Sequence, residues 1–196
     1  MPTIVVPFRG TNGKQRLAPL SDEARAALSL AMLADVLTAC TAVGETLVVT
    51  SDEEGARIAR ELEALVVPDP GGGQGAAVAA ALAPARDRRA LVVNGDLPCV
   101  VPDDLRALDR ATPDDGISYV AARDGTTNAL GLARARLFAP LYGHGSAARF
   151  RNDARDRGFS ATPASIANLV DDVDALEDLD RVQLRVGPRT RAVLAR

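Results

Sequence analysis

The chain is 196 residues long, carries a formal net charge of −3, and is 47% hydrophobic but only 3% aromatic. This length suits one domain with a sizeable core, whereas the lack of a basic tract and of aromatic stacking platforms disfavours nucleic-acid binding. No apolar run approaches the roughly 20 residues that a membrane span requires. The first residues have no signal-peptide pattern, so we expect a cytoplasmic protein that contacts neither membrane nor nucleic acid.

The first part of the chain alternates short β-rich runs with helical patterns. It predicts strands at residues 4–6, 47–49, 65–67 and 91–93, and helices at residues 22–40, 53–62, 76–83 and 103–110. Ser21 is the candidate N-cap of the first helix, and Pro102 lies near the N1 position of the fourth. Because such alternation is typical of parallel sheets with right-handed crossovers, we expect an α/β fold whose sheet is covered on both faces.

The pattern loosens after Gly116. We expect a strand at residues 117–121, a turn at residues 124–128, an apolar run at residues 129–132, and helices at residues 147–157 and from about Ala175. There is no internal repeat and no linker. We therefore expect a single domain spanning residues 1–196, in which the second part completes a substrate pocket.

Lys14 is the only lysine, and every other basic residue except His144 is an arginine. It lies in a glycine-bearing loop after the first predicted strand, where ligands of open α/β sheets bind. Loops of this kind bind phosphates through backbone N–H groups, and a lysine adds a mobile point charge. The alternative is a lone lysine on a solvated loop.

Soft-ligand metal sites are disfavoured. Cys40 and Cys99 lack metal-ligand spacing, which favours buried thiols in a reducing compartment, and a single histidine argues against zinc. Carboxylates remain. Asp96 follows the strand at residues 91–93, between Gly95 and a Leu-Pro pair, and is well placed to bind a divalent cation over phosphates. The alternative is a turn residue that caps the loop.

A second carboxylate cluster consists of Asp171, Asp172 and Asp174, one of which could supply another metal ligand. Its alternative is ordinary helix capping, because aspartate before a helix is favoured by the helix dipole.

The segment Gly143-His144-Gly145-Ser146 precedes a predicted helix, so its backbone and hydroxyl could bind an anion. His144 could act as a general base, although its neighbours favour a loop residue whose backbone matters more. The turn at residues 124–128 offers donors to the same anion, or is a plain hairpin turn.

The chain resembles the phospholactate guanylyltransferase family, which acts in the biosynthesis of coenzyme F-420. The resemblance extends from residue 4 to about residue 182 and depends on motifs that occur in the same order. These are Val-Pro-Phe-Arg (6–9) with Lys-Gln-Arg-Leu (14–17), Val-Thr-Ser-Asp (49–52), Asp-Pro-Gly-Gly-Gly (69–73), Asn-Gly-Asp-Leu-Pro (94–98), Thr-Thr-Asn-Ala-Leu (126–130), Gly-His-Gly-Ser-Ala-Ala-Arg (143–149) and Asp-Ala-Leu-Glu-Asp-Leu (174–179).

The resemblance implies a three-layer α/β sandwich with a mostly parallel central sheet, of the Rossmann-like nucleotide-diphospho-sugar transferase type. It implies that residues 1–115 bind the nucleotide and residues 116–196 bind the acceptor. Its implied roles fall into three groups. Lys14 and Arg16 would bind the triphosphate of GTP, with Ser51, Asp52, Gly71, Gly72 and Gly73 near the guanosine; Asp96 and Asp174 would bind Mg²⁺; Thr127, Gly143 and Ser146 would bind the acceptor phosphate.

Two departures from the family pattern affect these roles. Gln74-Gly75 replaces the family's Leu-Asn, whose asparagine helps contact the nucleoside, so the base preference is open. His144 replaces a proline in the acceptor segment, which changes the acceptor pocket.

The implied reaction is attack of a phosphorylated three-carbon acid on the α-phosphorus of GTP, with release of pyrophosphate. Lys14, Arg16 and Asp96 would be the catalytic residues, and a downstream transferase would take the unstable product. The sequence does not distinguish phospholactate, phosphoenolpyruvate and 3-phosphoglycerate, and it leaves the oligomeric state open. The alternatives are nucleotide transfer to molybdopterin or a sugar phosphate, and a nucleotide-binding module without turnover.

Overall fold

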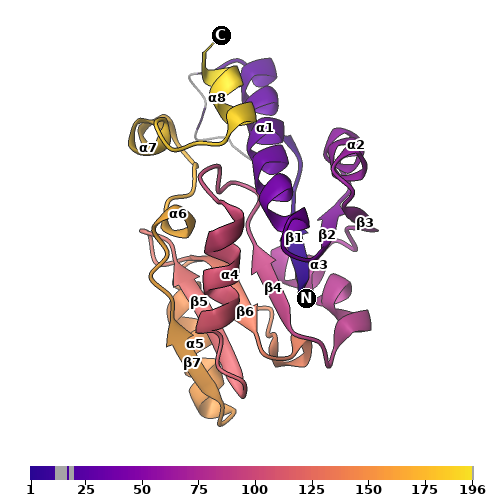
Figure 1. The fold of residues 1–196 in the computed structure, drawn as a ribbon, viewed down its shortest axis with the longest axis vertical. Coiled ribbons are helices and arrows are strands. Elements are labelled where there is room, and N and C mark those ends of the chain that lie inside the picture. The colour runs from indigo at the N-terminus through magenta and orange to yellow at the C-terminus, as the bar shows by residue number, and fades with distance from the viewer. Residues whose placement is uncertain (12–16, 18–19, 196) are drawn as a thin grey trace.

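The structure is a computed structural model that describes residues 1–11, 17 and 20–195. These residues form a seven-stranded sheet in the order β3-β2-β1-β4-β6-β5-β7 (Figure 1). Strand β6 is antiparallel to β4 and β5, and the other neighbouring strands are parallel, which confirms the mostly parallel sheet. The strands are β1 (Thr3–Pro7), β2 (Glu45–Thr50), β3 (Leu65–Pro68), β4 (Ala90–Val93), β5 (Gly116–Ala121), β6 (Thr127–Leu132) and β7 (Ser160–Pro163).

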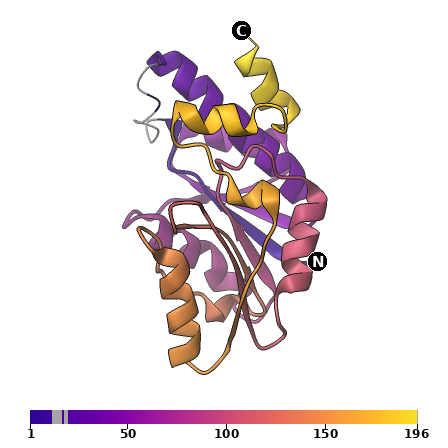
Figure 2. The same cartoon turned by 90° about the vertical axis from the view of Figure 1, so that its left-hand side faces the viewer.

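Helices cover both faces of the sheet, so the predicted three-layer arrangement is confirmed (Figure 2). Side chains alternate along β1: Ile4 and Val6 belong to the core beneath α1, α2 and α4, whereas Val5 belongs to the core beneath α3 and α5. The helices are α1 (Asp22–Thr41), α2 (Glu53–Glu61), α3 (Gln74–Leu82), α4 (Pro102–Ala111), α5 (Ser146–Asp156), α6 (Ala167–Val170), α7 (Leu176–Val182) and α8 (Pro188–Leu194).

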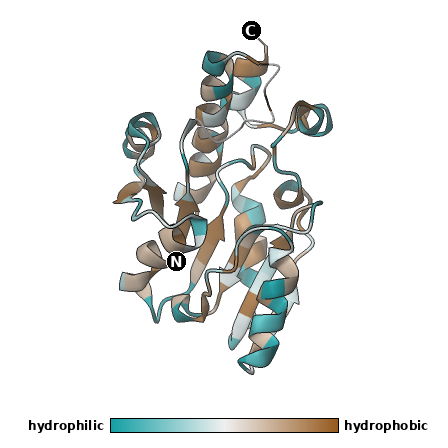
Figure 3. Ribbon diagram, turned by 180° about the vertical axis from the view of Figure 1, so that it is seen from behind, coloured by the Kyte–Doolittle hydropathy of each residue, from teal (hydrophilic) through white to brown (hydrophobic). Residues whose placement is uncertain are grey.

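Hydropathy follows these layers. The central strands are hydrophobic, whereas α2 and α5 present hydrophilic residues on their outer sides (Figure 3). A smaller core joins α1 to the C-terminal helices, through Leu28 and Met32 of α1 with Val182 and Val186 near α7. This third core brings the last part of the chain back to the first helix.

Helix α1 is the expected helix, and Ser21 caps it by accepting a hydrogen bond from the Ala24 N–H at 3.1 Å. Our expectation that no segment approaches a membrane span needs correction for this helix. By length and composition it qualifies, with a mean hydropathy of 1.4, because alanine and leucine dominate it. However, 61% of that apolar window is buried inside the fold, which is also typical of a core helix.

Several boundaries differ from the prediction. Helix α3 begins at Gln74, directly after Gly73 (φ 88°), so Gln74 and Gly75 form its first turn rather than a loop. Thr127 and Asn128 belong to β6 rather than to a turn, because this strand pairs with β5 from Thr127 onward. The short elements β7, α6 and α8 were not predicted.

Candidate active site

A cavity of about 300 Å³ opens at the point where the strand order reverses. After β1 the chain adds β2 and β3 on one side of β1, and then adds β4 on its other side. Ligands of open α/β sheets usually bind at such a reversal, here between the ends of β1 and β4. Residues 7–10 after β1 and residues 94–96 after β4 line the cavity. Because β6 is antiparallel, its first residue Thr127 reaches the same edge.

One wall of the cavity carries three carboxylates. Ligand oxygens of Asp96, Asp172 and Asp174 lie within 4.8 Å of one another, and all three side chains line the cavity. Burial, followed by the negative charges of Asp96 and Asp174, raises the pKa of Asp172 to about 6. Crowded, half-buried carboxylates of this kind are hard oxygen ligands suited to a divalent cation such as Mg²⁺.

The two segments that carry these carboxylates are joined by backbone contacts. The Val173 N–H donates to the Asp96 carbonyl at 3.1 Å. The Asp178 side chain in α7 accepts hydrogen bonds from the N–H groups of Asp174 and Ala175, each at 2.8 Å. The carboxylate that caps the start of α7 is therefore Asp178, which lies outside the predicted cluster of Asp171, Asp172 and Asp174.

A second wall of the cavity carries hydroxyl groups and glycines. The Ser146 hydroxyl, fully buried at the start of α5, donates to Thr127 Oγ1 at 2.9 Å, which leaves the Thr127 proton able to donate into the cavity. Gly143 (φ 110°) and Gly145 (φ 67°) allow the chain to enter α5 by this path. The positive end of the α5 dipole therefore faces this wall.

Aromatic packing supports this wall. Tyr142 lines the cavity and packs edge-on against Phe150 of α5, with ring centroids 5.5 Å apart. Burial raises the pKa of the Tyr142 hydroxyl, so this group stays protonated. Arg149 donates to the carbonyls of Leu141 and Tyr142, each at 2.9 Å, and so fixes the backbone that leads to Gly143.

His144 is exposed and does not line the cavity, so the structure gives its ring no contact there. It acts on neighbouring Asp124, which does line the cavity. Desolvation raises the pKa of Asp124, but hydrogen bonds donated by Thr126 and the nearby charge of His144 lower it below its usual value overall.

The start of α3 lines the cavity between these walls. Asn94 donates to the Thr127 carbonyl at 3.2 Å, and its own carbonyl oxygen accepts from Gln74 Nε2 at 2.8 Å. A Cβ at Gly75 would lie 2.7 Å from Pro140 Cβ, so only glycine allows this close approach. The Gln74-Gly75 pair thus connects Asn94, after β4, to the segment that carries Tyr142.

The nucleotide-side residues predicted from the sequence are only partly assembled. Ser51, Gly71, Gly72 and Gly73 are exposed and do not line the cavity. Asp52 accepts hydrogen bonds from the N–H groups of Gly55 (2.8 Å) and Thr11 (3.2 Å). It thereby caps α2 and holds the backbone at Thr11. Lys14 and Arg16 lie outside the described residues.

Arg9 and Asp172 are among the cavity residues that were missed as site residues. Arg9 is the one cationic side chain among the described residues that line the cavity. Its position directly after the first apolar run and before Gly10 was the available signal. Asp172 was part of the predicted carboxylate cluster but was given no metal-binding role. When several aspartates are close together in a segment without helix or strand, the sequence does not indicate which of them faces a cavity.

The fold and the two-walled cavity define a nucleotidyltransferase-type α/β protein, and comparison with known proteins agrees. The structure superposes on a putative nucleotide-diphospho-sugar transferase from Desulfovibrio desulfuricans G20 with a TM-score of 0.79 at 16% identity, covering 100% of this chain and 95% of the other. At that identity the likeness establishes the fold alone.

The family described as "Guanylyl transferase CofC like" matches residues 2–192, and the chain belongs to this family. A phosphoenolpyruvate guanylyltransferase from Nocardia farcinica is 38% identical over 92% of this chain and 84% of its own length. A 3-phospho-D-glycerate guanylyltransferase from Phenylobacterium zucineum is 35% identical over 95% of this chain and 91% of its own length.

Proposed function

We propose that the protein transfers a guanylyl group from GTP to a small phosphorylated three-carbon acid and releases pyrophosphate. One observation carries this proposal: a wall of carboxylates and a wall of hydroxyls and glycines face the same cavity at the switch point of the sheet. Membership of the guanylyl transferase family supports the nucleotide, and the names of both relatives support the class of acceptor.

The carboxylate wall fits a divalent cation. Three carboxylates whose ligand oxygens lie within 4.8 Å of one another offer the hard oxygen ligands that a divalent cation prefers, and burial together with the charges of Asp96 and Asp174 raises the pKa of Asp172. Asp96, Asp172 and Asp174 would hold Mg²⁺, which adds Asp172 to the pair expected from the sequence. Bound Mg²⁺ would neutralise phosphate charge and orient the reacting groups.

The nucleotide lies, in this proposal, along the loop after β1 and the start of α3. Lys14 and Arg16 bind the triphosphate and stabilise charge that develops on the leaving pyrophosphate. Arg9, at the cavity, adds a third cation. Ser51 and the three glycines at residues 71–73 lie farther out, toward the guanosine, and Asp52 binds the backbone N–H of Thr11.

The acceptor phosphate lies at the second wall, against Thr127, Gly143 and Ser146. Its second pKa is about 6, so it is largely ionised at neutral pH and needs no strong general base. This agrees with an exposed His144 that does not line the cavity. The side chains therefore act by positioning and charge stabilisation rather than by proton transfer.

The wider setting follows from the family resemblance. Residues 1–115 form the nucleotide-binding half and residues 116–196 the acceptor-binding half of a single domain. The protein works in the cytoplasm, in coenzyme F-420 biosynthesis, and passes its product to a downstream transferase. Phospholactate, phosphoenolpyruvate and 3-phosphoglycerate are the candidate acceptors.

The test is pyrophosphate release with GTP, Mg²⁺ and each acid in turn. We expect release with one acid, no release when Mg²⁺ is chelated, and little release when ATP or CTP replaces GTP. Release with a sugar phosphate but with none of the three acids would overturn the acceptor class. Nucleotide binding without pyrophosphate release under any condition would overturn the proposed turnover.

A further inference from the structure

Two of the three clustered carboxylates lie in a segment without helix or strand. Residues 171–175 connect α6 to α7 and carry Asp172 and Asp174. Because such a segment lacks regular backbone hydrogen bonding, contacts from surrounding elements must fix the direction of its side chains. Val173 supplies one contact, since its side chain is fully buried and its N–H binds the Asp96 carbonyl.

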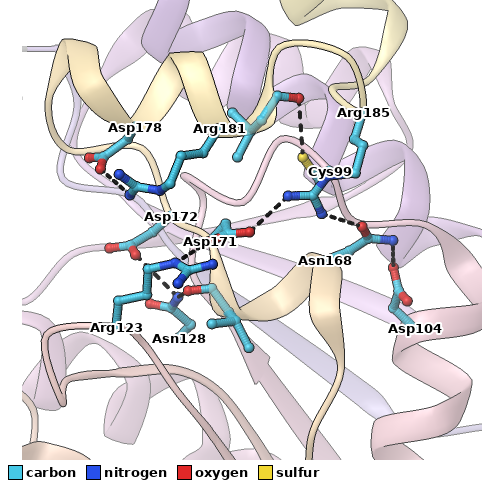
Figure 4. Close-up of polar contacts among 12 residues, drawn as sticks. Cys99, Asp104, Arg123, Asn128, Asn168, Asp171, Asp172, Asp178, Arg181 and Arg185 are labelled. Carbon is cyan, nitrogen blue, oxygen red and sulfur yellow. Dashed lines mark hydrogen bonds and ion pairs between the residues drawn. The ribbon is translucent and has the colours of Figure 1, made fainter.

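Asp171 supplies a stronger anchor at the start of the segment. Its side chain is only 7% exposed, and its two oxygens have different arginine partners. Oδ1 accepts from Arg123 Nε at 2.6 Å and Oδ2 accepts from Arg185 Nη2 at 2.8 Å (Figure 4). With both oxygens engaged, the carboxylate cannot rotate without breaking an ion pair.

The two arginines come from opposite sides of the segment. Arg123 follows β5, and Arg185 lies between α7 and α8. Arg185 also donates to Asn168 Oδ1 at 3.0 Å, and Asn168 donates to Asp104 of α4 at 3.0 Å (Figure 4). Asp171 is thereby connected to a helix that packs on the sheet.

Asn128 braces the same segment from the sheet. This buried β6 side chain donates from Nδ2 to the Val170 carbonyl at 3.1 Å and to Asp172 Oδ1 at 3.4 Å. Val170 and Asp172, the two neighbours of Asp171, are therefore both hydrogen-bonded to strand β6. Rotation of the backbone at Asp171 would break the hydrogen bond between Asn128 and Asp172.

We propose that Asp171 is a positioning residue for the metal-binding carboxylates. It holds Asp172 and Asp174 toward Asp96 through its two arginine partners and does not itself bind the metal. This inference rests on the metal site of the proposed function. Residues that orient metal ligands typically contribute about 10- to 100-fold to metal affinity.

The test is equilibrium binding of Mn²⁺ to the purified full-length protein, followed by electron paramagnetic resonance of free Mn²⁺. Asp171→Asn keeps the shape of the side chain but removes its charge, and we expect the Mn²⁺ dissociation constant to rise by about 10- to 100-fold. The matched control is Asp35→Asn. Asp35 is equally buried, at 5% exposure, but it binds the N–H groups of Arg189 and Thr190 at the start of α8.

The control separates positioning from stability. Both variants should unfold at lower denaturant concentration, but only Asp171→Asn should lose Mn²⁺ affinity. If the two folded variants bind Mn²⁺ within twofold of the unaltered protein, Asp171 is a purely structural residue and the inference is overturned. If the unaltered protein binds no Mn²⁺, the metal site of the proposed function fails instead.

A second variant covers the case in which Asp171→Asn does not fold. Arg123→Gln removes one partner whose side chain is 61% exposed, so the fold should tolerate it. We expect a several-fold loss of Mn²⁺ affinity with little change in the unfolding transition. Unchanged affinity in Arg123→Gln, together with an Asp171→Asn variant that is unfolded or binds normally, would overturn the inference.

Discussion

The two walls of the cavity are polar in opposite ways. On the carboxylate wall, burial and the negative charges of Asp96 and Asp174 raise the pKa of Asp172 to about 6. On the hydroxyl wall, the Ser146 hydroxyl satisfies Thr127 at 2.9 Å, and no ionised group is needed. The first wall offers ligands suited to a cation, and the second offers donors to an anion.

The largest expected effect comes from the carboxylate wall. Asp96→Asn removes one of three proposed metal ligands, and we expect a loss of several kcal/mol of transition-state stabilisation, or about 100- to 1,000-fold in kcat. Turnover is measured over a range of Mg²⁺ concentrations, with Asp103→Asn, an exposed α4 residue, as control. Near-normal turnover with unchanged Mg²⁺ dependence would remove Asp96 from the site.

The next effect concerns the triphosphate. Lys14→Ala should lower kcat/KM for GTP by about 10- to 100-fold, because it removes a charge that stabilises the leaving pyrophosphate. The control is Arg155→Ala, an exposed α5 residue that is paired with Asp156. Equal effects of the two substitutions would mean that the loop after β1 does not bind phosphate.

A smaller effect is expected on the hydroxyl wall. Ser146→Ala removes the hydrogen bond to Thr127, and we expect KM for the acid to rise by about 5- to 30-fold, equivalent to about 1–2 kcal/mol. Mn²⁺ affinity should stay unchanged, because the carboxylate wall is intact. Ser160→Ala, on the exposed strand β7, is the control. A loss of Mn²⁺ affinity in Ser146→Ala would show that the two walls are not independent.

The smallest effect concerns the link between the walls. Gly75→Ala places a methyl group 2.7 Å from Pro140 Cβ, so we expect the free energy of unfolding to fall by about 1–3 kcal/mol. Chemical denaturation measures this change, and Ala80→Ser on the exposed side of α3 serves as the control. If Gly75→Ala is as stable as the control, α3 does not hold Pro140 closely in solution.

Much of the fold was predictable because strands and helices leave periodic patterns. The four parallel strands β1 to β4 and the cap at Ser21 followed from apolar runs and local capping chemistry. Strand β7 was missed because it has only four residues, Ser-Ala-Thr-Pro, which show no clear alternation of apolar and polar side chains. The antiparallel direction of β6 is a property of its neighbours, and nothing within residues 127–132 encodes it.

The cavity was predictable where a residue directly follows a strand. Asp96 follows β4 closely, so its place at the sheet edge depends on that strand, whereas Thr127 was expected in a turn and its role came from the family resemblance. Asp172 was not singled out, because the residue that its carboxylate contacts, Asn128, is distant in sequence. The family resemblance supplied Asp174 but not this bracing.

The most direct test of the account is mass detection of the nucleotidylated acid. Protein, GTP and Mg²⁺ are incubated with phosphoenolpyruvate, phospholactate or 3-phosphoglycerate, and a downstream transferase captures unstable product. We expect a guanylylated product with at least one acid and about 100- to 1,000-fold slower product formation with Asp96→Asn. Absence of a guanylylated product with all three acids, in a protein that binds GTP and Mg²⁺, would contradict the account.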